Sequence, residues 1–405
     1  MESEKNKIFN PGVDRVLVAQ AVFDQAEMDA VQEVLKKGWL GPGEASAEFE
    51  TKIAQLFGKK YGLFVNSGTS ANIVAMEIAN LPRGSEVITQ ACTFPATLSP
   101  IIFSDHIPVF VDSLVGTYNI DVDQIESAIS EKTKAIFISH AVGNINDMIR
   151  IREICDKHGL LFIEDSCDTH GSKYQGEAPG KWSDITTTSF YASHNITAGG
   201  GGGMVMVNSE AMIKDAKVVR DWGRALPENY DENIDERFDF KVDGIPYDGK
   251  FTFLKLCYNF KPVEMQAAFG LVQLEKLSKF NEIRKKNFAR LYEFFKNYPE
   301  HFILPETLPE TDIAWLAFPL TIKEGSSINR KELLTYLENN KIQTRLLFSG
   351  NVLRHVPYKS IPHRKVGDLK NSDFIMKNTF LIGLNHSLTD EMIDYVTDKF
   401  KNYIK

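Results

Sequence analysis

Residues 62–72 read GLFVNSGTSAN, in which a short apolar run is followed by small and polar residues. The apolar run predicts a buried strand, and the small residues that follow predict a tight turn into a helix that runs to Leu81. Such a turn allows backbone N–H groups to approach an anion, and the dipole of the helix favours negative charge at the same place. The stretch therefore predicts a strand–turn–helix unit, with Gly68, Thr69 and Ser70 at a candidate phosphate site.

The alternation of apolar runs and helical segments continues to about residue 210. Further apolar runs occupy residues 86–89, 108–111, 134–138 and 160–163. Helical patterns occupy residues 24–37, 121–130 and 146–158. Strands buried on both faces and separated by helices predict an α/β fold with a mostly parallel central sheet. Because ligands bind at the C-terminal strand ends of such sheets, the residues that follow the strands are the candidates for a site.

The length of 405 residues predicts two domains. We place a large domain with an N-terminal helix at residues 1–265, and a linker helix with a smaller C-terminal α+β domain at residues 266–405. Residues 227–250 form an acidic, aromatic stretch punctuated by glycine and proline, which predicts a long loop. The loop is either a lid or contact segment, or a solvated insertion.

The composition excludes several classes of protein. The net charge of -8 argues against a nucleic-acid or anionic-membrane partner. No apolar run reaches the roughly 18 residues of a membrane span, and the first residues lack a signal-peptide core, so we expect a cytoplasmic protein. The four scattered cysteines predict packing residues or pocket-lining thiols instead of disulfides, and the nine histidines show no metal-ligand spacing, so no metal site is expected.

Polar and aromatic residues follow the other predicted strands. Phe94 follows the second strand and is a core residue or a ring that stacks on a ligand. Asp165 follows Leu-Leu-Phe-Ile-Glu, where a carboxylate needs a cationic partner or hydrogen bonds, or else caps a helix. The strand at 184–191 is followed by His194 and by five glycines at 199–203, which indicate a tight loop or backbone close to a ligand.

These motifs together resemble the sugar aminotransferase (DegT/DnrJ/EryC/StrS) family of fold type I pyridoxal-phosphate (PLP) enzymes. The resemblance rests on G-T-S-A at 68–71, E-D at 164–165, S-F-Y-x-x-H-x-I at 189–196 and Y-N-F-K-P-V-E-M-Q-A-A at 258–268. It implies an aspartate-aminotransferase-like fold in which residues 1–265 bind the cofactor.

The resemblance also implies roles for individual residues. Asp165 would pair with the ring nitrogen of the cofactor, and Phe94 would stack on the ring. Ser189 and residues 68–70 would bind the phosphate. Asp168 would contact the 3′-oxygen of the cofactor. Asn259 would reach the phosphate bound by a second subunit, which implies a homodimer with shared active sites.

The position of the family's cofactor-binding lysine is occupied here by His194, and no lysine occurs between Trp182 and Ile213. Imidazole does not hold the cofactor covalently as lysine does, but it transfers protons near neutral pH. This exchange resembles the 3-dehydratase branch of the family, which acts in ascarylose and colitose biosynthesis. The ascarylose-pathway member carries an iron–sulfur cluster on cysteines whose counterparts here are absent, because Gly203 takes the first place and residues 225–250 contain none.

The resemblance therefore implies C3 dehydration of a nucleotide-linked 4-keto-6-deoxy sugar by non-covalently bound pyridoxamine 5′-phosphate (PMP). His194 would be the general base, L-glutamate would return the cofactor to its amine form, and no iron–sulfur cluster would take part. Arg345 would bind the sugar or its phosphates, or form a structural ion pair. A sugar aminotransferase and a non-catalytic subunit that binds cofactor or nucleotide sugar remain as alternatives.

Overall fold

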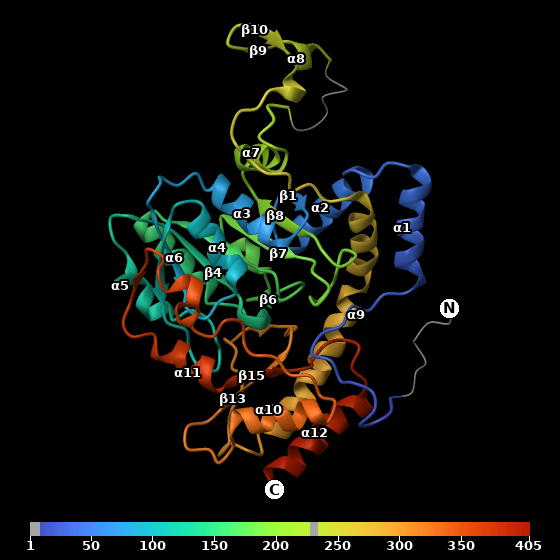
Figure 1. Ribbon diagram of the computed structural model, residues 1–405, viewed down its shortest axis with the longest axis vertical. Coiled ribbons are helices and arrows are strands. Elements are labelled where there is room, and N and C mark those ends of the chain that lie inside the picture. The colour runs from blue at the N-terminus through green and yellow to red at the C-terminus, as the bar shows by residue number, and fades with distance from the viewer. Residues whose placement is uncertain (1–8, 227–233) are drawn as a thin grey trace.

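The computed structural model describes residues 9–226 and 234–405. Its largest element is an eight-stranded sheet covered by helices, and a smaller helical and sheet layer lies below it in Figure 1. The order across the sheet is β1 (Tyr61–Val65), β8 (Gly203–Val207), β7 (Ile185–Ser189), β5 (Leu161–Asp165), β4 (Thr133–Ser139), β2 (Glu86–Gln90), β3 (Ile107–Val111) and β14 (Arg364–Lys365). Strand β8 is antiparallel to both neighbours and the other pairs are parallel, which confirms the predicted α/β fold with a mostly parallel sheet.

Both faces of this sheet are buried, as the continuous apolar runs predict. In β4, Ala135 and Phe137 pack into one core cluster, while Ile136 and Ile138 pack into another. Successive side chains of a strand point to opposite faces, so an uninterrupted apolar strand needs cover on both sides. The helices of this layer are α2 (Glu44–Leu56), α3 (Gly68–Ile78), α4 (Pro95–Phe103), α5 (Ile125–Ala128), α6 (Met148–His158) and α7 (Glu210–Arg220).

The ends of several helices follow from the sequence. Helix α1 (Gln25–Lys37) begins with a capping box between Asp24 and Glu27, and ends at Gly38, whose φ of 77° is left-handed. These are the ends that the sequence predicts. The helix predicted at 121–130 is only partly correct, because a 3₁₀ turn at Val122–Gln124 precedes the four-residue α5.

The second layer contains an antiparallel sheet of β11 (Phe302–Ile303), β13 (Phe318–Ile322) and β15 (Thr379–Ile382), with α10 (Arg330–Asn339), α11 (Lys370–Asn378) and α12 (Asp390–Ile404). The 32-residue helix α9 (Glu264–Phe295) runs alongside both layers (Figure 1). Short two-residue strands β6 (Lys173–Tyr174) and β12 (Thr311–Asp312) also pair.

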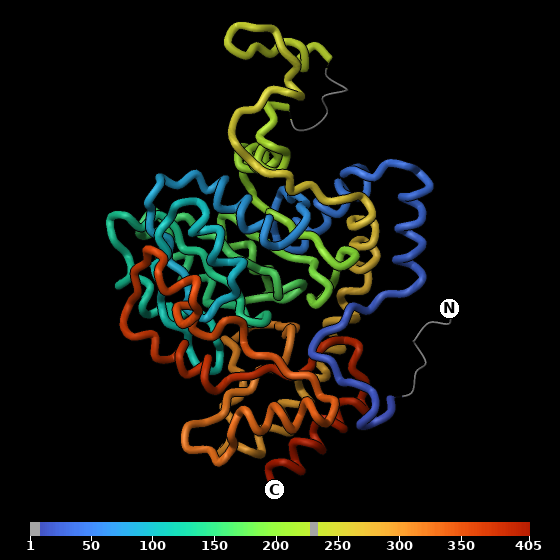
Figure 2. The backbone as a smooth tube through the Cα atoms, viewed as in Figure 1, coloured from blue at the N-terminus to red at the C-terminus, as the bar shows by residue number. Residues whose placement is uncertain are grey.

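Two segments each pack in the layer formed mainly by the other end of the chain. Val16, near the N-terminus, pairs with Ile342 and packs in the core of the C-terminal layer (Figure 2). Strand β14, from the C-terminal part, extends the large sheet beside β3. The division at residue 265 stays a proposal, and chain order alone does not assign these two segments to a layer.

The predicted loop at 227–250 is ordered over much of its length. Helix α8 (Ile234–Phe238) and the hairpin of β9 (Phe240–Val242) and β10 (Ile245–Tyr247) extend away from the main body in Figure 1. The prediction of a loop is therefore wrong for residues 234–247, which form α8 and a hairpin in which the turn at Asp243–Gly244 lets two short strands pair. Whether the segment acts as a lid or contact segment stays a prediction. Residues 227–233 lie outside the described residues. In the part of the chain that is described, no helix has the length and apolar character to span a membrane.

Candidate active site

A cavity of about 550 Å³ lies at the C-terminal ends of the central strands. It falls within the range of about 300–1,000 Å³ that small-ligand sites occupy. The walls come from the ends of β4, β5 and β7, the start of α3, the loop before α4, residues 18–19 and the C-terminal layer. Of the residues proposed from the sequence, those that line this cavity are Gly68, Thr69, Phe94, Asp165, Asp168, Ser189, His194 and Arg345.

Asp165 is a buried carboxylate with neutral partners. Its Oδ2 accepts hydrogen bonds from Nδ2 of Asn72 at 2.8 Å and from Oγ1 of Thr97 at 2.7 Å, and its Oδ1 accepts one from the backbone N–H of Cys167 at 3.2 Å. The residue is 6% exposed. A carboxylate in this setting is well suited to accept a further hydrogen bond from a protonated ring nitrogen in the cavity.

The start of α3 and the end of β7 form a cradle of small residues. A Cβ added to Gly68 would lie 2.6 Å from Cβ of Ser189, so only glycine fits here without displacement. Ser67 caps the helix by accepting from the backbone N–H of Ser70, and the hydroxyl of Ser70 donates to Oδ1 of Asn66. Ser70 does not line the cavity, and its side chain supports the turn; Gly68, Thr69 and Ser189 are therefore the candidates to bind a phosphate.

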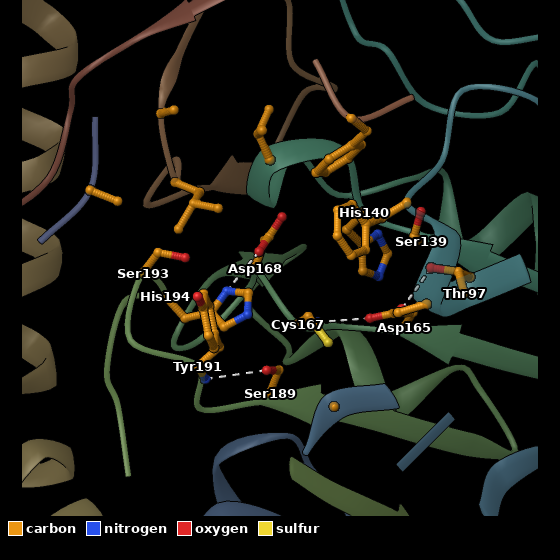
Figure 3. Close-up of a pocket in the computed structure, with 18 of the residues that line it drawn as sticks. Thr97, Ser139, His140, Asp165, Cys167, Asp168, Ser189, Tyr191, Ser193 and His194 are labelled. Atoms are coloured by element: carbon orange, nitrogen blue, oxygen red, sulfur yellow. Dashed lines mark hydrogen bonds and ion pairs between the residues drawn. The ribbon is translucent and has the colours of Figure 1, made fainter. Parts of the chain in front are cut away.

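His194 follows β7 and lines the cavity. Its Nδ1 lies 3.0 Å from Oδ1 of Asp168, and Figure 3 shows the imidazole beside Tyr191 with its other nitrogen directed toward Cys167. The sequence did not predict the contact with Asp168. Because an imidazole offers an unprotonated nitrogen to a ligand when its other nitrogen is bonded, this arrangement is suited to proton transfer.

Phe94 and Arg345 stand at the mouth of the cavity. Phe94 is 54% exposed and packs edge-on against Phe348, with 6.0 Å between ring centroids. It is therefore not a core residue, and one face of its ring is accessible to a ligand. Arg345 is exposed and is held by backbone hydrogen bonds to Leu381, so its guanidinium is available to an anion.

Asn259 lies elsewhere. It is exposed, pairs through its backbone with Asp221, and does not line the cavity of its own chain. The predicted contact with a second subunit stays a prediction.

Sequence reasoning missed several cavity residues and their supports. Tyr191 lines the cavity beside His194, and Asn72 and Thr97 hold Asp165. Neither Asn72 nor Thr97 belongs to a strand end, so no local signal marks them. Tyr191 belongs to the motif at 189–196, and its place three residues before His194 was a usable signal.

His140 also lines the cavity, in a fixed orientation. Its Nδ1 accepts from the backbone N–H of Asn146 at 3.2 Å, and its Nε2 lies 3.3 Å from Oε2 of Glu164. A nitrogen that accepts carries no proton, so the proton of the neutral ring is on Nε2 and is donated to Glu164. This leaves no free basic nitrogen on His140, and His194 remains the histidine suited to act as a base in the cavity.

The residues present fit a phosphorylated pyridine cofactor. The buried Asp165 carboxylate suits a protonated ring nitrogen, and the cradle at Gly68 and Ser189 suits a phosphate. Cys167 and the ring of Phe94 also line the cavity, and an aromatic side chain suits a flat ring as a ligand.

Comparisons with known proteins agree with this geometry. The model of the DegT/DnrJ/EryC1/StrS aminotransferase family matches residues 22–401. The chain is 40% identical to the lipopolysaccharide biosynthesis protein RfbH of Salmonella typhimurium, with 99% of this chain and 94% of that protein covered. It is 36% identical to dTDP-4-dehydro-2,6-dideoxy-D-glucose 3-dehydratase of Saccharopolyspora spinosa, with coverage of 99% and 89%.

A solved structure of GDP-4-keto-6-deoxymannose-3-dehydratase with a trapped PLP-glutamate geminal diamine matches with a TM-score of 0.85 and 27% identity, over 95% of this chain and 99% of that one. The match shows that the fold is that of fold type I PLP enzymes. With nearly the whole chain inside the family model, this protein belongs to the DegT/DnrJ/EryC1/StrS aminotransferase family.

Proposed function

We propose that this protein catalyses the C3 dehydration of a nucleotide-linked 4-keto-6-deoxyhexose in 3,6-dideoxysugar biosynthesis. The observation that carries the proposal is His194, which stands in the cavity in place of a lysine and in contact with Asp168. The absence of lysine from residues 182–213 means that no neighbouring amine replaces it. The relatives named as 3-dehydratases support the same reaction class.

In this proposal the residues of the cavity have separate roles. PMP, when bound, would supply an amine that joins the C4 ketone and a ring that accepts electron density. Asp165 would hold the proton on the ring nitrogen, Gly68, Thr69 and Ser189 would bind the phosphate, and Phe94 would cover the ring. These contacts orient the cofactor without a covalent bond.

His194 is proposed to move the protons of the reaction. As a general base, it takes a proton at the C4′ carbon of the cofactor, and as a general acid it returns a proton to the departing 3-oxygen of the sugar. Arg345, at the mouth of the cavity, would bind the phosphates of the nucleotide, because a guanidinium matches two phosphate oxygens at once.

The electron balance determines the co-substrate. Loss of the 3-hydroxyl with retention of the C4 ketone is a two-electron reduction of the sugar. Oxidation of L-glutamate to 2-oxoglutarate and ammonia supplies two electrons, so sugar and glutamate balance without a reductase. The chain lacks the cluster-binding cysteines of the ascarylose-pathway enzyme, so we propose that no iron–sulfur cluster is involved.

The test is mass spectrometry of products formed from a panel of nucleotide-linked 4-keto-6-deoxyhexoses with PMP and glutamate. We expect a 3-deoxy product together with equal amounts of 2-oxoglutarate and ammonia. An amino sugar that retains its 3-hydroxyl would establish the aminotransferase alternative, and cofactor binding without turnover of any sugar would establish a non-catalytic subunit. Stoichiometric iron and acid-labile sulfide in anaerobically purified protein, with turnover driven by NADH and a reductase, would refute the glutamate route.

Two parts of the proposal concern assembly. We propose a homodimer in which Asn259 of one subunit serves the phosphate site of the other, because Asn259 is exposed and does not line the cavity of its own chain. We also propose that residues 1–265 provide the cofactor site and residues 266–405 close it. Sedimentation of the purified protein, and cofactor titration of an Asn259→Ala variant, test these statements; a monomer with unchanged cofactor affinity would refute them.

A further inference from the structure

The contact between His194 and Asp168 is not explained by cofactor binding. Nδ1 and Oδ1 are 3.0 Å apart, and the two side chains are 14% and 8% exposed. The distance is that of a hydrogen bond, although the Nδ1–H direction is not aligned with the carboxylate. Because histidine χ2 is a soft torsion, a small rotation of the ring aligns the two groups.

A carboxylate at this distance determines which nitrogen of the facing imidazole carries the proton. Carboxylate oxygens only accept hydrogen bonds, so in the neutral ring the nitrogen that faces Asp168 is the donor. Nε2 is then unprotonated, and it is the nitrogen directed into the cavity. A neutral imidazole with the opposite proton placement would present an N–H to the cavity and would not act as a base there.

We propose that Asp168 is a positioning residue for His194, which holds the ring with Nδ1–H against its carboxylate. The inference rests on the proposed function for the claim that His194 is the base. The placement of the proton on the ring, however, is a property of the protein that is measured without any reaction.

The test is ¹⁵N NMR of protein with ring-labelled histidines, with and without PMP, at a pH of about 8, where a free imidazole is neutral. A His194→Asn variant identifies the resonances of His194 among the nine histidines by difference. We expect Nδ1 to be protonated and Nε2 unprotonated in the natural protein. Asp168→Asn should show the same pattern, because its amide oxygen still accepts a hydrogen bond. Asp168→Ala should lose the preference for a proton on Nδ1. Protonated Nε2 in the natural protein, or an unchanged pattern in Asp168→Ala, would overturn the proposal.

Activity separates this inference from the proposed function. Asp168→Ala is expected to lower kcat about 10- to 100-fold with little change in KM, which is part of the roughly 10²- to 10⁴-fold that a positioned acid or base contributes. Asp168→Asn is expected to recover part of this loss. If the natural protein dehydrates no sugar, the proposed function fails while the NMR result still decides the role of Asp168. If Asp168→Ala does not fold, the NMR spectra of the natural protein and of Asp168→Asn decide the role of Asp168. A protonated Nε2 in either of them overturns the proposal.

Discussion

Replacement of Gly68 by alanine will crowd the turn at which we propose that the cofactor phosphate binds. The new Cβ would lie 2.6 Å from Cβ of Ser189, 2.9 Å from its Oγ and 3.3 Å from Sγ of Cys167. Non-bonded carbons rest about 3.5–4.0 Å apart, so one side must move by roughly 1 Å. Ser189 is paired with Gly203 in the sheet, and this limits the movement of its backbone.

Two opposing effects determine the change in stability. Alanine in an unstrained helical position would stabilise the fold by about 0.4–1 kcal/mol, because it lowers the conformational entropy of the unfolded chain. Overpacking of a tight contact costs about 1–3 kcal/mol. The overpacking term is larger, so we expect a net loss of about 1–2 kcal/mol.

The effect on cofactor affinity is expected to be larger than the effect on stability. If Ser189 is displaced, its hydrogen bond to a charged phosphate, worth about 1.5–3 kcal/mol, is lost. At about 1.4 kcal/mol per tenfold, the Kd for PMP should rise about 10- to 100-fold. Urea denaturation measures the stability, and titration of cofactor-free protein by its fluorescence measures the Kd.

The matched control is Gly41→Ala. A Cβ at Gly41 meets nothing within 4 Å, and its backbone is not in the left-handed region, so this variant should bind the cofactor normally. If Gly68→Ala binds PMP as tightly as Gly41→Ala and the natural protein, the phosphate does not lie at this turn and the reasoning is refuted.

Three further predictions follow from the same structure. His194→Lys should yield a pyridoxyl adduct on that residue after borohydride treatment, seen by peptide mass spectrometry, whereas the natural protein should yield none between residues 182 and 213; an adduct in the natural protein would contradict non-covalent binding. Glu264→Ala should cost about 2–4 kcal/mol in urea denaturation, because the carboxylate accepts three backbone N–H groups at the start of α2 and each unsatisfied donor is costly; Glu264→Gln should cost less, and equal losses would contradict this account. The hydrogen bond from Arg364 lowers the pKa of Glu86 from 4.5 to about 2, so the ionised Glu86 stabilises the fold above pH 4.5, and this contribution is lost as the pH falls toward 2. Arg364→Met should reduce the loss of unfolding free energy between these pH values, measured by urea denaturation. An unchanged pH dependence in this range would show that the pair does not contribute.

The fold prediction came from patterns among residues that are near neighbours in the sequence. The apolar runs predicted the buried strands because a strand covered on both faces needs no polar alternation, and β4 is such a strand. The cap residues of α1 predicted its two ends because capping is a contact between near neighbours in sequence. The prediction of a loop was wrong at 234–247, where α8 precedes a hairpin at 240–247, because two short strands depend on their turn more than on an apolar pattern.

The sequence by itself determined the α/β class, the strand ends that carry a candidate site, and the exchange of lysine for His194. Only the tertiary structure brought Asp168 against His194 and placed Asn72 and Thr97 on Asp165. The physical reason is distance along the chain. Motifs record which residue follows a strand, whereas hydrogen bonds and charge interactions depend on separations of a few ångströms between segments that the fold alone brings together.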